Sequence, residues 1–234
     1  MRKKHLLSNQ QSGFTIIELM ISISVLSVIL LTVTVGIIQL SKSYYKGIIQ
    51  ATTQQTARSL IDDVSSSIEF GSFTGLGTGS ASLAGTYGLG FTEQSYCIGQ
   101  QRYSYVLHYQ QSAAQPTSAT AGYSKHSLWK DGTATACTPL DVGKADPNSG
   151  LGGKELLGEH MRLTKFAISE AMVNGVPSNS LYNISITIMY GDDDIMDQSN
   201  PDMSKWTCKS SATIFAVAFC AKSQLTTVVG KRLS

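Results

Sequence analysis

The sequence predicts an α+β fold in which a long N-terminal α-helix packs on an antiparallel β-sheet head. Residues 16–38 are apolar and contain one ionisable residue, Glu18. Apolar residues then recur at three-, four- and seven-residue steps as far as Ile68, which continues the helix. Runs that alternate apolar and polar residues follow, most clearly at 181–190. Together these patterns predict a helix followed by a sheet.

The first half of this helix is long enough to cross a membrane. A helix over residues 16–38 spans the roughly 30 Å hydrocarbon core at about 1.5 Å per residue. Arg2, Lys3 and Lys4 make the denser basic cluster, which predicts that the N-terminal end is cytoplasmic and the rest of the chain lies outside. We therefore expect a single-pass protein of the cytoplasmic membrane.

Gly13 precedes the apolar run, whereas a secretory signal peptide has its cleavage site after that run. Cleavage after Gly13 would keep the apolar segment on the mature protein and make Phe14 the new N-terminus. Glu18 lies at bilayer depth, where an unpaired carboxylate costs about 3 kcal/mol or more. We expect its partner to be the α-amino group released at Phe14 of a neighbouring copy or sister subunit.

The residues Gly13, Phe14, Thr15, Ile16, Ile17 and Glu18 resemble the class III signal sequence of type IV pilins and of type II secretion pseudopilins. This resemblance implies a pilin-like fold and cleavage after Gly13 by a prepilin peptidase, which also N-methylates Phe14. It implies that Glu18 guides assembly with other pilins or pseudopilins, with the help of assembly platform proteins, into an extracellular filament or its tip. The alternative is an ordinary signal anchor that tolerates Glu18.

Five segments follow from these patterns. We expect a cleaved leader over 1–13, a transmembrane half of the helix over 14–40, an amphipathic half over 41–70, a Gly/Ser-rich linker over 71–95 and a β-rich head over 96–234. The apolar face of the second half comprises Ile37, Tyr44, Tyr45, Ile48, Ile49, Leu60, Ile61, Val64 and Ile68. This face should pack on the head of the same chain.

Strands are expected at 103–109, 161–168, 181–190, 212–220 and 225–229. Asp131-Gly132 predicts a hairpin turn between residues 127–130 and 133–137. The last two strands could pair through a turn at 222–224. This layout resembles, more loosely, the W-type minor pilins and J-type minor pseudopilins over 103–109, 156–168, 181–190 and 225–232.

The four cysteines all lie in the exported part, which fits an oxidising compartment and two disulfides. Three pairings are possible. Proximity in sequence favours Cys97 with Cys137 and Cys208 with Cys220. Zinc is disfavoured because no two cysteines have the close spacing of a zinc site.

The densest group of oxygen ligands is an acidic segment near the C-terminus. Its carboxylates are weak calcium candidates, because the spacing is not that of an EF-hand; they are Asp192, Asp193, Asp194, Asp197 and Asp202. A solvated acidic turn is the alternative. No other cofactor is expected.

Composition argues against nucleic-acid binding through charge. Without the leader, the chain has 15 Lys and Arg residues and 16 Asp and Glu residues, so the mature chain offers no broad basic surface. His108, His126 and His160 fall in no catalytic signature, and we expect no enzyme activity.

The predicted function is therefore structural, that of a minor pilin or pseudopilin, because the head is large. One alternative is a filament-displayed binding module, an adhesin or DNA-uptake subunit, whose tyrosines stack on sugars or bases or form core; they are Tyr103, Tyr105, Tyr109 and Tyr123. The machine served, whether a retractile pilus, a competence pilus or a type II secretion system, stays open.

Overall fold

The computed structural model describes residues 13–71, 75–82, 92–110, 127–132, 137–139, 153–209 and 219–232. The chain divides into two compact units, Met1–Tyr44 and Tyr45–Ser234. The first unit holds the start of a helix, and the second holds the rest of that helix together with the β-sheets.

Helix α1 runs over Ile16–Phe70, 55 residues, which confirms the predicted long N-terminal helix. Apart from half-buried Lys42, its residues in the first unit are exposed, including large aliphatic side chains throughout. In the second unit one stripe is buried, at Ile49, Thr53, Ala57, Leu60, Val64 and Ile68. These positions are three or four residues apart and so lie on one face of the helix.

Four residues of the predicted apolar face are buried as expected, namely Ile49, Leu60, Val64 and Ile68. Elsewhere the buried face differs from the prediction. Tyr44, Tyr45 and Ile48 are exposed. Thr53 and Ala57, which the pattern of large apolar residues did not mark, are fully buried. Thr53 is accommodated because its hydroxyl donates a hydrogen bond to the Ile49 carbonyl at 2.7 Å.

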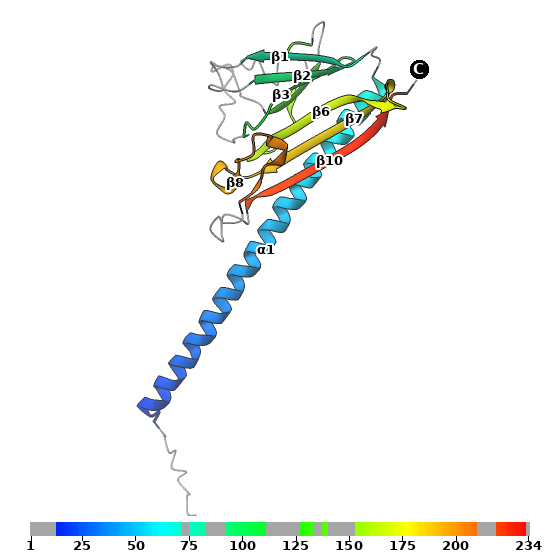
Figure 1. Cartoon of the computed structure of the whole chain (residues 1–234). Helices are drawn as coiled ribbons and strands as arrows, with labels where there is room; N and C mark the ends of the chain where they lie inside the picture. Colours follow the sequence, from blue (N-terminus) through cyan, green and yellow to red (C-terminus); the bar gives the residue numbers. More distant parts are fainter. Residues whose placement is uncertain are drawn as a thin grey trace, which may run out of the picture. The chain divides into compact units, whose positions relative to one another are not determined.

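In the part of the head that the structure describes, ten strands form three antiparallel sheets (Figure 1). The largest sheet has the order β1-β2-β3-β4-β5. Its strands are β1 (Gly77–Ser82), β2 (Thr92–Ile98), β3 (Gln101–Val106), β4 (Leu128–Gly132) and β5 (Lys154–Glu155).

The second sheet has the order β10-β7-β6 and is built on a long hairpin. Its strands are β6 (Met161–Val173), β7 (Val176–Tyr190) and β10 (Ala221–Gly230). Asn174 and Gly175 make the hairpin turn with positive φ values of 52° and 81°, as a two-residue turn between twisted strands requires. A small third sheet pairs β8 (Met196–Asp197) with β9 (Thr207–Cys208), flanked by the 3-10 turns η2 (Asp193–Ile195) and η3 (Met203–Lys205).

One hydrophobic core joins the C-terminal part of α1 to the two larger sheets. Ala57, Leu60, Val64 and Ile68 of the helix lie in it. Phe166 of β6 contacts three tyrosine rings of the other sheet. The α+β arrangement of a long helix on antiparallel sheets is therefore confirmed (Figure 1).

Three local predictions are wrong. The glycine-rich part of the linker expected over 71–95, residues 71–90, contains the regular strand β1. Asp131 and Gly132 form no turn: both lie in β4, where Asp131 is opposite Arg102 of β3. The proposed turn at 222–224 lies inside β10, which pairs with β7 over its whole length.

The other expected strands have mixed outcomes. Those at 161–168, 181–190 and 225–229 are confirmed and are longer than predicted. The strand predicted at 103–109 ends at Val106, and His108 has a φ of 52°. Residues 133–136 and most of the predicted strand at 212–220 lie outside the described residues.

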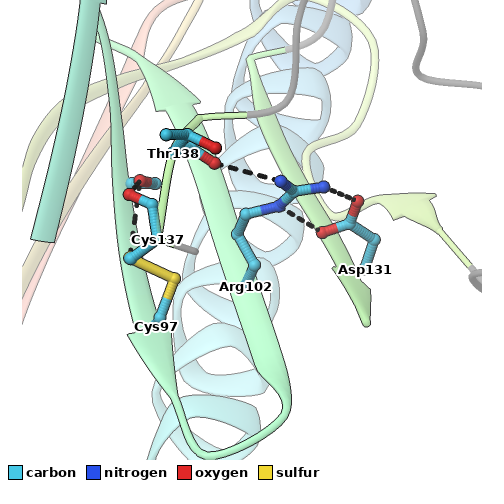
Figure 2. The surroundings of a disulfide bond; sticks show 6 residues. Cys97, Arg102, Asp131, Cys137 and Thr138 are labelled. Carbon is cyan, nitrogen blue, oxygen red and sulfur yellow. Dashed lines mark hydrogen bonds and ion pairs between the residues drawn. A yellow bond between two sulfur atoms is a disulfide. The ribbon is translucent and has the colours of Figure 1, made fainter. Parts of the chain in front are cut away.

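Two disulfides, Cys97–Cys137 and Cys208–Cys220, join the cysteines in the pairs that sequence proximity favoured. Figure 2 shows the first of them beside the ion pair of Arg102 and Asp131. The sequence separations are 40 and 12 residues. On chain-entropy grounds these loops stabilise the folded state by about 4 and about 3 kcal/mol respectively.

Candidate functional site

The predicted processing site lies in an exposed, extended segment before α1. Gly13 and Phe14 precede the helix, and Phe14 is 77% exposed. A Cβ added to Gly13 would meet no atom within 4 Å, so packing within the chain does not require glycine at this position.

Thr15 and Glu18 form a reciprocal cap at the start of α1. The Thr15 hydroxyl donates to Glu18 Oε2 at 3.2 Å, and the Glu18 backbone N–H donates to Thr15 Oγ1 at 3.3 Å. The Thr15 backbone N–H also lies 3.4 Å from Glu18 Oε2. This is the capping box, in which two side chains satisfy backbone donors that the first helical turn leaves free.

The cap gives Glu18 a role that our sequence reasoning missed. Besides its unpaired charge and the assembly role that the resemblance implies, Glu18 completes a Thr-x-x-Glu pattern before an apolar run, which is a recognisable capping signal. Its carboxylate also complements the positive end of the helix dipole. Glu18 thus lies one helical turn from the predicted new N-terminus and binds backbone there.

The helix that follows is suited to a membrane or to a bundle of helices. In the described part of the chain, α1 is the one helix long and apolar enough to cross a membrane, and its apolar window is unburied. Its hydroxyl side chains donate to carbonyls of the preceding turn, which satisfies them without water; they are Ser22, Ser24, Ser27, Thr32 and Thr34.

The acidic segment near the C-terminus holds the five predicted calcium candidates, and the structure gives four of their carboxylates different partners, whereas Asp194 accepts from Lys209 Nζ through its backbone carbonyl at 2.8 Å. Asp192 accepts a hydrogen bond from Gln110 Nε2 at 2.6 Å, and Asp193 pairs with Arg162. Asp197 and Asp202 accept from backbone N–H groups two residues ahead, at 3.1 and 3.0 Å. Within the described ranges, no three His, Cys, Asp or Glu residues gather as a metal site.

Electrostatics in this segment follow from those partners. The hydrogen bond from Gln110 lowers the pKa of Asp192, and His160 adds to the effect. Burial raises the pKa of Asp193, but the hydrogen bond and charge of Arg162 outweigh it, so the pKa is lowered. Arg162 itself is almost fully buried and also donates to the Gly191 carbonyl at 3.1 Å. No local sequence pattern predicts its role, because Asp193 is 31 residues away.

The four tyrosines that were expected either to stack on ligands or to form core differ in burial. Tyr103 and Tyr105 are buried in the core, while Tyr109 is half-buried. Tyr123 lies outside the described residues. Two of the four candidates are therefore core residues.

The histidines are also dispersed. His108 lies beside the Trp206 ring, and burial together with the Arg162 charge lowers its pKa. His160 lies 3.4 Å from both Glu159 and Asp192. A φ of 58° at His160 turns the chain here. His126 is outside the described part of the chain.

One comparison with known proteins identifies the N-terminal segment. Residues 8–34 match the family described as the prokaryotic N-terminal methylation motif, the class III signal sequence. The match includes Gly13, Phe14, Thr15 and Glu18, and it is consistent with the type IV pilin and pseudopilin family. Neither the curated proteins nor the solved structures contain a match.

Proposed function

Because the chain carries the class III signal sequence of type IV pilins and pseudopilins, which implies prepilin peptidase processing and assembly with other pilins, we propose that it is a minor pilin or pseudopilin. It is cleaved after Gly13, methylated on Phe14 and assembled through α1 into a pilus-like filament or its tip complex. The observation that carries the proposal is the methylation motif at 8–34, placed at the start of an exposed apolar helix.

The structural contacts of Glu18 support a role in assembly. In the uncleaved chain its carboxylate binds only local groups among those described, the Thr15 hydroxyl and backbone N–H. Cleavage adds a cation at Phe14, and a buried carboxylate in lipid is strongly stabilised by such a partner. Pairing of the Glu18 carboxylate with the Phe14 α-amino group of another subunit therefore stabilises this carboxylate in lipid more than the Thr15 cap alone does.

The size of the head supports a minor rather than a major subunit. The second unit, from Tyr45 to Ser234, carries three sheets and two disulfides. A structural role for this head fits the dispersed histidines and the individually partnered carboxylates described above. We propose a location in the cytoplasmic membrane before assembly and in an extracellular filament afterwards.

Two variants test the proposal in cells that contain a prepilin peptidase and the assembly platform. Gly13→Arg places a long cation at the scissile bond and should leave the leader uncut on an immunoblot. Glu18→Ala should be cut normally but be reduced in sheared filament fractions or in cross-linked complexes with other pilins. Normal cutting of Gly13→Arg, or normal assembly of Glu18→Ala, would contradict the proposal.

A further inference from the structure

A pocket of about 370 Å³ opens on one face of the five-stranded sheet. Thr78 and Ser80 of β1, Gln94 and Tyr96 of β2, and Tyr105 of β3 line it. The strand register places Thr78 opposite Tyr96, Ser80 opposite Gln94, and Gln94 opposite Tyr105. Because directly opposed residues share a face of the sheet, these side chains converge on one surface.

The other face of β1 explains why only hydroxyl side chains of this strand reach the pocket. A Cβ on Gly79 would lie 1.8 Å from the Cys137 carbonyl oxygen, and a Cβ on Gly77 would lie 3.3 Å from Cβ of both Cys97 and Cys137. The disulfide segment therefore covers that face, and Figure 2 shows it over β2. Glycine alternates with threonine and serine so that one face of β1 is closed and the other is open.

The aromatic wall of the pocket is fixed by the core. The Tyr96 and Tyr105 rings are stacked, with centroids 5.6 Å apart and planes 12° apart. Phe166 meets both rings edge-on, at 5.3 and 5.0 Å. The wall is thus rigid before any ligand arrives, which lowers the entropy lost on binding.

The chemistry of the lining is polar and uncharged. Among the described residues, those that line the pocket include no Lys, Arg, Asp or Glu, so none of them offsets the charge of a phosphate or carboxylate ligand. Hydroxyl and amide groups beside an aromatic wall suit a neutral ligand with many hydroxyls. The volume lies at the small end of the range for ligand pockets, about 300 to 1,000 Å³, which fits one or two sugar rings.

We propose that this pocket binds a neutral saccharide unit, a hexose or an N-acetylhexosamine. The apolar face of the sugar ring packs on Tyr96, and Gln94, Thr78 and Ser80 bind its hydroxyl or acetamido groups. This binding function is additional to the assembly role and does not depend on it, because every lining residue belongs to the second unit.

The test uses the full-length chain in detergent micelles, with glucose, galactose and N-acetylglucosamine as separate probes. Ligand-observed saturation-transfer NMR should detect binding of at least one of the three. Thr78→Trp fills the pocket from an exposed strand position and should abolish the signal. Thr226→Trp is the matched control, an exposed threonine on β10, and should bind as the wild type does.

A second pair of variants keeps the test decisive if Thr78→Trp does not fold, as judged by circular dichroism. Gln94→Leu keeps the size of the side chain but removes its hydrogen-bonding groups, and should weaken binding about tenfold. Gln224→Leu, at an exposed position of β10, should leave the affinity unchanged. Absence of binding for all three sugars, or equal binding by wild type, Gln94→Leu and any folded Thr78→Trp, would overturn the proposal.

Discussion

At the residue scale, a small polar network fixes the contact between α1 and the five-stranded sheet. Asp63 on the helix accepts hydrogen bonds from Lys130 Nζ at 2.8 and 2.9 Å and from the Tyr103 hydroxyl at 2.9 Å. The Tyr103 hydroxyl also lies 2.8 Å from the Ser67 hydroxyl. Since Tyr103 is fully buried, its hydroxyl depends on Asp63 and Ser67 for hydrogen-bond partners.

We predict that Tyr103→Phe lowers the free energy of unfolding by about 1 kcal/mol, because it removes the hydroxyl and leaves the ring packing intact. Denaturant unfolding of the purified full-length chain in detergent measures the change. Lys130→Met removes the charged partner of Asp63 and should have an effect of the same sign. No change in either variant would show that the network does not stabilise the helix on the sheet.

The same burial predicts a response to alkaline pH. Burial raises the pKa of Tyr103 and of Tyr105 far above the ordinary value of about 10 for tyrosine. A group whose pKa is higher in the folded state than in the unfolded state stabilises the fold fully below its unfolded pKa. This stabilisation is lost as the pH rises from the unfolded pKa through the folded pKa. We therefore expect the stability of the head to fall above pH 10 or so.

Phenolate absorbance and circular dichroism, followed together as the pH is raised, measure this response. The last tyrosines to ionise should do so only as the dichroism of the head is lost. Ionisation of all ten tyrosines while the dichroism stays intact would contradict the predicted loss of stability at alkaline pH.

At the scale of elements, β1 shows how a long-range contact overrides local preference. Glycine and serine disfavour strands, and residues 71–90 therefore predicted a linker. The strand forms because Gly77 and Gly79 let the Cys137 segment approach closely, while Ser95 donates a hydrogen bond to the Cys137 carbonyl at 3.1 Å. That contact spans 42 residues and leaves no local signal.

We predict that Gly79→Ala destabilises the head by roughly 2 kcal/mol, because the added methyl group collides with backbone rather than with a movable side chain. Gly75→Ala is the control in the same stretch, since nothing lies within 4 Å of its added Cβ. Thermal unfolding of both variants checks the prediction. Equal unfolding temperatures would mean that the Cys137 segment does not cover β1.

In β4, an ion pair with a distant residue likewise overrides the local preference for a turn. An Asp-Gly pair between short strands usually makes a turn, but Asp131 lies in a ladder because Arg102 on the neighbouring strand binds both its carboxylate oxygens, at 2.9 and 2.5 Å. Arg102 also donates to the Thr138 carbonyl at 3.0 Å, as Figure 2 shows. Such a partner could not be identified from residues near Asp131 in the sequence.

At the scale of the whole molecule, the sequence predicts best what local patterns encode. The long helix, its apolar first half, the strands of the long hairpin and the nearest-neighbour disulfides all follow from spacing within short segments. The sheet order, the buried Arg162 and the pocket beside Tyr96 depend on residues far apart in the chain. The predicted assembly residues fall in the first group, and the candidate sugar pocket falls in the second.

The central claim is that the apolar helix becomes the mature N-terminus of an assembly subunit. Intact-mass and N-terminal sequence analysis of the protein, recovered from membranes of cells with an active prepilin peptidase, tests this claim most directly. We expect the recovered chain to begin at Phe14, with the apolar segment retained and one added N-methyl group. A chain that still begins at Met1, or one cut after the apolar segment, would contradict it.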